Sequence, residues 1–150
     1  EDVVQSEMAT FFAAFPQGTI WSNDIDGQGY DVVLLGQVEA LRIDVPALRQ
    51  RLEQADHSRV VESLAEVKFD SVVDLLATYA GQAPDLASWL RDAQINTDRN
   101  LRLQYLAGLA LNAVEGQRIY DDLLAGRRFP EKLFVAPPAE KLRLRDAIGN

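Results

Sequence analysis

The 150-residue chain contains no cysteine and only one histidine. Disulfide frameworks, thiolate nucleophiles and cysteine zinc sites are therefore excluded, and a single histidine cannot form a histidine metal cluster. No apolar run approaches the ~18 residues that a membrane-spanning helix needs. The sequence also has no Gly-x-Gly-x-x-Gly motif, the usual dinucleotide-binding turn. Most familiar catalytic and cofactor signatures are thus missing.

The composition that remains is that of an ordinary folded domain with an acidic bias. Hydrophobic residues make up 47% and charged residues 25%, which favours a globular, soluble, cytoplasmic chain. The net charge is −8, and the first 50 residues carry eight acidic side chains but only Arg42 and Arg49 as basic ones. Because an acidic field repels phosphate and attracts cations, we expect no nucleic-acid partner. For the same reason, the charge favours an amine over a phosphate-bearing ligand.

The first 38 residues have the pattern of a helix followed by a β-hairpin. Apolar residues at helical spacing predict a helix over 2–15, which Pro16 and Gly18 end. Two β-rich runs follow, at 19–22 and 30–35, with a turn-forming loop between them. The second run is continuously apolar over 32–35, which indicates a strand covered on both faces.

From residue 39 onward the apolar spacing is helical. Asp44 and Asp70 are expected to cap helices, another helix is expected near 58–67, and Thr97 or Asp98 is expected to open a long, deeply buried one. A last helix is predicted near 138–148. The fold class is therefore α+β and mostly helical, with a helix and hairpin in domain 1–38 and an α-helical bundle in domain 39–150.

Three segments of the sequence are similar to a known family. The words FPQGTIWSND (15–24), GYDVVLLG (29–36) and INTDRN (95–100) resemble the C-terminal part of bacterial spermidine synthase-like proteins. The resemblance implies that residues 1–38 are the closing helix and hairpin of a Rossmann-like methyltransferase sheet. It also implies that residues 39–150 are the helical extension found downstream of that sheet.

The family resemblance implies an activity for the parent protein but none for this chain alone. Family members transfer an aminopropyl group from decarboxylated S-adenosylmethionine to a polyamine acceptor, using a glycine-rich turn and an aspartate that both lie upstream. Because neither is visible here, we expect no cofactor site and no catalytic residue in this chain. Its expected partners are the upstream catalytic domain, a polyamine and, as a further candidate, a second copy of the chain. Membrane segments in the parent stay an open question.

In a sheet of that family, the end of the first hairpin strand would face the acceptor pocket. The candidate substrate-binding residues are therefore Trp21, Asp24, Asp26 and Tyr30, since carboxylates hold ammonium groups and aromatic rings stack on cations. Two alternatives stay open. The acidic loop is also good turn chemistry, with side chains that cap their own backbone. The whole chain could also be a noncatalytic helical protein-interaction module.

Overall fold

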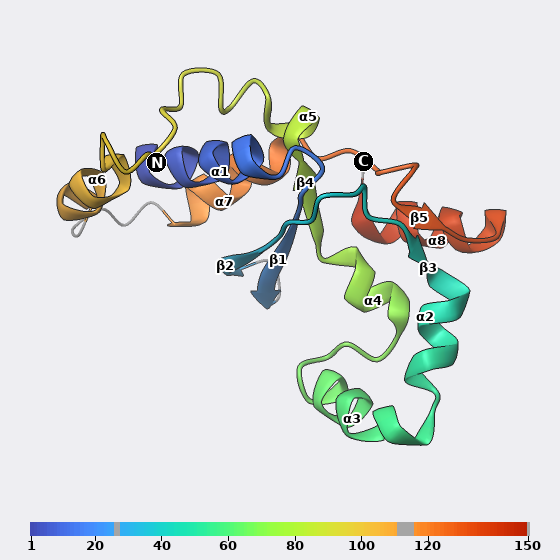
Figure 1. The fold of residues 1–150 in the computed structure, drawn as a ribbon. Helices are drawn as coiled ribbons and strands as arrows, with labels where there is room; N and C mark the ends of the chain where they lie inside the picture. Colours follow the sequence, from blue (N-terminus) through green and yellow to red (C-terminus); the bar gives the residue numbers. More distant parts are fainter. Residues whose placement is uncertain (26–27, 111–115, 150) are drawn as a thin grey trace. The chain divides into compact units, whose positions relative to one another are not determined.

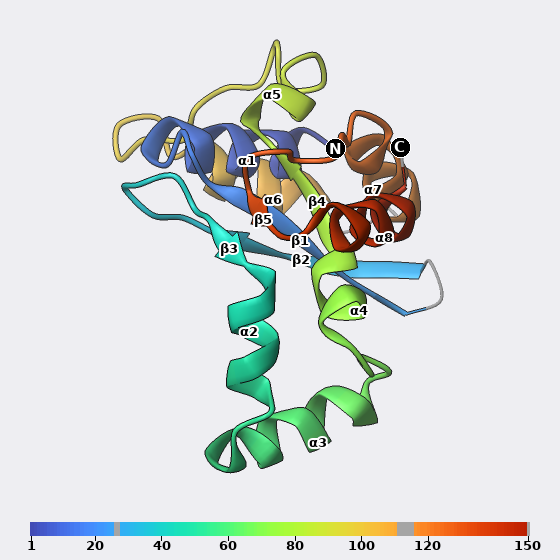
Figure 2. The same cartoon turned by 90° about the vertical axis from the view of Figure 1, so that its right-hand side faces the viewer.

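The computed structural model describes residues 1–25, 28–110 and 116–149, and these form an α+β fold that is about half helical (Figures 1 and 2). The α+β class predicted from the sequence is confirmed at this level. Helix α1 (Asp2–Ala14) is followed by a hairpin of β1 (Thr19–Ile25) and β2 (Gln28–Leu35). The remaining elements are, in chain order: β3 (Ile43–Asp44), α2 (Val45–Leu52), the 3-10 turn η1 (Ala55–His57), α3 (Ser58–Glu66), α4 (Val72–Ala77), β4 (Tyr79–Gln82), α5 (Ala83–Leu86), α6 (Arg102–Ala110), α7 (Gly116–Ala125), β5 (Phe134–Val135) and α8 (Pro138–Ile148).

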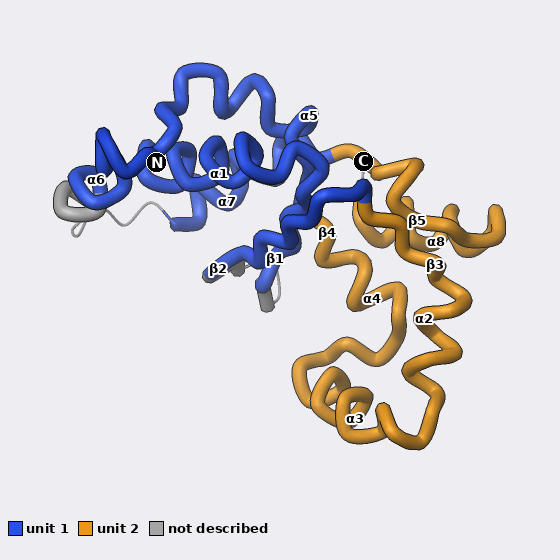
Figure 3. Tube along the Cα trace, in the orientation of Figure 1, with its two compact units in different colours: residues 1–40, 80–127 blue, residues 41–79, 128–150 orange. Residues whose placement is uncertain are grey.

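The chain divides into two compact units, each built from two stretches of sequence (Figure 3). Unit 1 contains residues 1–40 and 80–127, and unit 2 contains residues 41–79 and 128–150. The helix and hairpin at the start of the chain thus share a unit with α5, α6 and α7. Each unit has its own buried apolar side chains and is described by itself.

Helix α1 has the limits that its apolar spacing predicts. It runs from Asp2 to Ala14, and the Phe15 backbone N–H caps it by donating to the Phe11 carbonyl before Pro16. The helix buries Met8 and Phe12 on one face. These two side chains meet Ile20 from the hairpin and Leu123 from α7 in the apolar core of unit 1. Burial of one helical stripe against the hairpin therefore holds this unit together.

The predicted hairpin is present and sets the geometry of unit 1. Strand β1 (Thr19–Ile25) pairs antiparallel with β2 (Gln28–Leu35), with Trp21 opposite Val33 and Asn23 opposite Asp31. Strand β4 lies on the other side of β1, so the sheet order is β2-β1-β4. Among the described residues, β2 is therefore an edge strand, paired on one side only.

The two faces of β2 differ, and this corrects one expectation from the sequence. Val32 and Leu34 pack against the core cluster, as a buried strand should. Val33 is 55% and Leu35 43% exposed, so the strand is covered on one face only rather than on both. Because successive strand side chains point to opposite faces, the continuous apolar run places two large apolar residues on an open face.

The start of α6 also differs from the expectation at Thr97 or Asp98. The helix begins at Arg102, after a turn in which the Thr97 N–H donates to Asn100 Oδ1 at 2.9 Å and Leu101 has a φ of 44°. The left-handed φ of Leu101 prevents helix from continuing through it. Asn96 Oδ1 instead accepts the Leu103 N–H at 2.9 Å and satisfies one orphan donor of the first turn.

Unit 2 combines α2, α3, α4 and α8 with a short parallel sheet. Strands β3 and β5 pair through Ile43 and Phe134, and Phe134 meets the buried ring of Tyr79 edge-on, with ring centroids 6.3 Å apart. Helices α3 and α8 lie where their apolar spacing predicts them. The N-cap of α4 is Ser71 rather than Asp70, because the Ser71 hydroxyl accepts the Asp74 N–H.

Replacing Asp44 by alanine is expected to lower the free energy of unfolding by about 1 kcal/mol. Asp44 caps α2, and its carboxylate accepts the Ala47 N–H at 2.9 Å. Asp70→Ala is the matched control, since Asp70 is exposed and lies one position before the actual cap of α4. Urea denaturation followed by circular dichroism measures both variants. Equal losses would contradict the assignment of Asp44 as a cap.

Candidate functional site

The structure places three of the four predicted site residues, Trp21, Asp24 and Tyr30, on the strands of the hairpin and describes the side chain of Trp21 only. Trp21 is half-buried on β1, and its indole N–H donates to Thr19 Oγ1 at 2.8 Å. Asp24 lies on β1 and Tyr30 on β2, and their side chains lie outside the described residues, as does the whole of Asp26. The backbone thus brings Asp24 and Tyr30 close to the turn of one hairpin, with Asp24 inside β1 rather than in the predicted loop.

A polar pair crosses the hairpin close to that end. Asn23 Nδ2 donates to Asp31 Oδ1 at 2.6 Å between directly opposite residues of β1 and β2. Both side chains are exposed. The Asn23 amide thus fixes one of the two carboxylate oxygens of Asp31. The Asp31 carboxylate was not among the candidates from the sequence, although Asp31 is the second residue of the predicted β-rich run 30–35.

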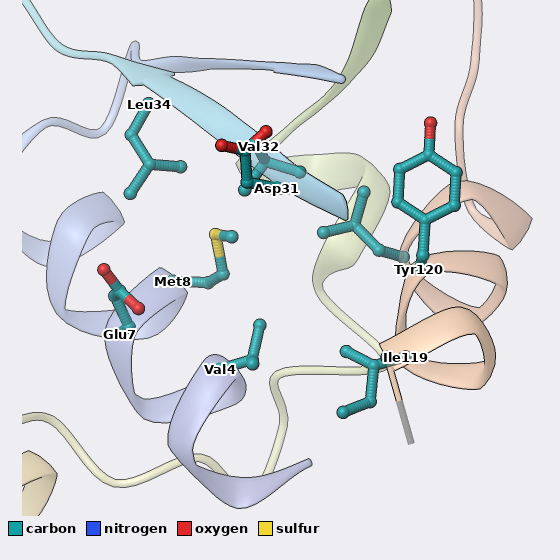
Figure 4. A pocket seen from close by; sticks show the side chains of 10 residues that line it. Val4, Glu7, Met8, Asp31, Val32, Leu34, Ile119 and Tyr120 are labelled. Carbon is teal, nitrogen blue, oxygen red and sulfur yellow. The ribbon is translucent and has the colours of Figure 1, made fainter. Parts of the chain in front are cut away.

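An apolar pocket of about 350 Å³ lies in unit 1 between α1, β2 and α7 (Figure 4). Figure 4 shows Val4 and Met8 from α1, Val32 and Leu34 from β2, and Ile119 from α7 around it. This volume is within the range of small-molecule sites. The pocket also includes Glu7, Asp31, Gly116, Tyr120 and Leu123.

The pocket combines an apolar wall with two carboxylic acids. Glu7 and Asp31 are both exposed, so their charges lie where solvent or a ligand can reach them. A ligand with an aliphatic body and a cationic end would match this lining, because methylene groups gain from apolar contact and an ammonium group gains from a carboxylate. Sequence reasoning missed Glu7, since only the packing of α1 on β2 brings it near the hairpin.

Two carboxyl groups outside this pocket have perturbed acidity. A hydrogen bond from Arg118 lowers the pKa of Glu1, and a hydrogen bond with the neighbouring His57 lowers the pKa of Asp56. Because His57 contacts Asp56 across only one peptide bond on an exposed turn, this pair forms a local surface contact. Neither group adds a nucleophile or general base to the pocket.

The described residues contain neither a metal-ligand cluster nor a membrane-spanning helix. Within 1–25, 28–110 and 116–149, no group of three or more acidic or histidine side chains could hold a metal ion. In that part of the chain, no helix has both the length and the apolar character to cross a membrane.

Comparison with protein-family models, with curated proteins and with solved structures found no match to this chain.

Proposed function

We propose that this chain is the C-terminal part of a spermidine synthase-like protein, in which residues 1–38 complete a Rossmann-like sheet and form one wall of the polyamine acceptor pocket. Residues 39–150 would form the helical extension of the same protein. The order of α1, β1 and β2 and the antiparallel register of the hairpin support this proposal. The sequence segments that carry the resemblance lie in or next to these elements and in the turn before α6.

The single observation that carries the proposal is that β2 has an exposed apolar face and, among the described residues, an unpaired edge. This edge strand exposes Val33 and Leu35 on one face and has no described strand beyond it. Long apolar edge strands favour uncontrolled pairing, and proteins normally cover or interrupt them. A neighbouring strand and helix from an upstream domain would supply the second cover that the apolar run 32–35 predicts.

The acidic end of the hairpin and the pocket beside β2 suit a polyamine. Such a molecule alternates methylene segments with ammonium groups, which match the apolar lining and the carboxylates of Glu7 and Asp31. In the proposed reaction, a neutral acceptor nitrogen attacks the methylene carbon bonded to the donor's sulfonium. The new N–C bond forms as the C–S bond breaks, and the amine proton passes to an upstream aspartate.

A comparison of two polypeptides tests this proposal. The present chain and the natural chain extended by its upstream residues are titrated calorimetrically with putrescine and with decarboxylated S-adenosylmethionine. We expect the donor to bind only the longer chain, and aminopropyl transfer only there, because the glycine-rich turn and catalytic aspartate lie upstream. A longer chain that binds neither ligand would overturn the proposal.

A charged substitution on the open face of β2 tests whether an upstream domain covers this face or whether the face stays exposed to solvent. Val33→Asp is expected to change the stability of the present chain by less than about 0.5 kcal/mol, because Val33 already faces solvent. In the longer chain the same carboxylate would be buried without a partner, and donor binding should fall by about tenfold or more. Val38→Asp is the control, since Val38 is exposed beyond the end of β2. Equal effects of both substitutions in the longer chain would argue against a covering domain.

One observation favours the second candidate, a noncatalytic protein-interaction module. Helix α3 has no buried residue and exposes Val60 and Val61. Val61 also lines a groove of about 340 Å³ in unit 2, together with Leu64 and Phe69. Exposed apolar residues beside a groove are typical of partner surfaces. The titration of the longer chain decides between the candidates, because an interaction module would bind neither small ligand.

A further inference from the structure

A second, polar cavity of about 340 Å³ lies in unit 1, away from the hairpin. It is formed by the first turns of α1, the segment after α5 and the start of α6. Figure 1 shows the segment between α5 and α6 running past the N-terminal half of α1. Its chemistry is set by charged and polar side chains: Asp2, Gln5, Ser6, Asp92 and Arg102, with Trp89 beside them. No residue of β1 or β2 contributes to it.

Hydrogen bonds between elements give this cavity a fixed frame. Gln5 Nε2 donates to the Trp89 carbonyl at 2.8 Å, and Ser6 Oγ donates to the Gln94 carbonyl at 2.6 Å. Ser6 is itself buried. The segment that follows α5 has little regular structure, yet these bonds tie it to α1. The cavity is thus preformed by side chains that are already oriented, which reduces the ordering cost of binding a ligand.

Arg102 is the feature that points to a ligand. Its Nε is buried and has no hydrogen-bond partner, and over the described residues its guanidinium forms no ion pair. A buried donor without a partner is uncommon, because it loses its hydration without replacing it. The guanidinium fork is suited to a carboxylate. A carboxylate bound in this cavity would pair with the terminal N–H groups of this guanidinium, because the Nε itself is closed to solvent and therefore to a ligand.

The two aspartates of the cavity decide which kind of anion could bind there. In the described part of the chain, neither Asp2 nor Asp92 is paired with a basic side chain, and neither reaches Arg102 as an ion pair. The neighbouring Glu1 differs, since it already accepts hydrogen bonds from Arg118 and Trp89. A simple anion would face two uncompensated carboxylates, and a simple cation would leave Arg102 unpaired. Only a ligand with both charges compensates all three groups.

We propose that this cavity binds a small zwitterion of the α-amino acid class, with its carboxylate on Arg102 and its ammonium group between Asp2 and Asp92. The volume admits a free amino acid with a polar side chain, and Trp89 is part of the lining. The proposal does not rest on the proposed function, because the two sites share no residue.

Calorimetric titration of the chain with glycine, L-glutamine and L-lysine tests this site. At least one of these probes should bind saturably. For the one that binds, the N-acetyl derivative, which lacks the ammonium group, and the amide, which lacks the carboxylate, should each bind about tenfold or more weakly. These ligand comparisons use the unaltered protein, so they do not depend on the folding of a variant. Absence of binding by all three probes, or equal binding of the derivatives, would overturn the proposal.

Matched variants locate the binding site on the chain. Arg102→Met keeps much of the apolar stem but removes the charge, and it should lower the affinity for the amino acid by about tenfold or more. Arg99→Met is the control, because Arg99 lies on the exposed turn nearby and its replacement should leave the affinity unchanged. Asp92→Asn should weaken binding severalfold, with the exposed Asp98→Asn as its control. Circular dichroism verifies the fold of each variant, and Arg102→Lys, which keeps the charge without the fork, should give intermediate affinity. Unchanged affinity in folded Arg102→Met would place the ligand elsewhere.

Discussion

Replacing Ile20 by alanine is expected to lower the free energy of unfolding by about 3–4 kcal/mol. Ile20 is fully buried at the centre of unit 1, on β1, and meets Met8 and Phe12 from α1 and Leu123 from α7. The substitution removes three carbon atoms from a site that helix and sheet enclose from both sides. Because the neighbouring side chains come from separate elements, they can collapse only partly into the space.

Urea denaturation followed by tryptophan fluorescence and circular dichroism measures this loss. Ile95→Ala is the matched control, because Ile95 lies exposed in the same unit and the Asn100 side chain bonds only its backbone carbonyl. The control should cost less than about 1 kcal/mol. Since domains of this size have only about 5–15 kcal/mol to lose, the Ile20 variant should show a clearly lower midpoint. Similar losses for both variants would mean that Ile20 is not part of a packed core.

The predictions that the structure confirms are those with strong local signals. Helix α1 has a regular apolar stripe and a proline after its end, and the hairpin has two β-rich runs around a turn. Helix α8 likewise begins at Pro138, a residue suited to a first turn. In each case the local preference and the buried face agree, so the sequence alone was enough.

The predictions that failed involve choices made by distant or competing contacts. Thr97 was expected to cap a helix, but Asn100 captures its backbone N–H in a turn. The helix predicted after Thr97 or Asp98 was expected to be deeply buried, yet Tyr105 on this helix is 69% exposed. Periodicity shows which side chains share a face but does not say how much of that face another element covers.

The candidate sites show the same limit. Trp21 and the acidic loop could be selected because turn residues and β-rich runs mark a hairpin end in the sequence. Glu7 and Arg102 could not, because each becomes part of a cavity only when segments about a hundred residues apart in the chain come together. A lone arginine in a helix is usually a solvated residue, and only its buried, unpartnered Nε distinguishes this one.

Replacing Gly126 by alanine should lower the free energy of unfolding by about 3 kcal/mol. Gly126 follows the last residue of α7, and an added Cβ would lie far inside van der Waals contact with the backbone carbonyl oxygen of Asp85 in α5. A side chain could rotate away, but this oxygen belongs to a backbone that the Gln82 N–H anchors by donating to Asp85 Oδ2 at 3.0 Å. One of the two helices must therefore move.

Gly116→Ala provides a control of the opposite sign at the other end of α7. Apart from the chain neighbours of Gly116 and the backbone of its own helix, no described atom lies within 4 Å of an added Cβ there, so alanine meets no obstacle and restricts the unfolded chain more than glycine does. It should leave the unfolding free energy unchanged or raise it by up to about 1 kcal/mol. Urea titrations should thus show a lower midpoint for Gly126→Ala and an unchanged or higher midpoint for Gly116→Ala. A Gly126→Ala protein as stable as Gly116→Ala would show that α5 and the end of α7 do not approach as closely as the structure indicates, and the core that Leu86 and Leu123 share between these elements would then lose its geometric basis.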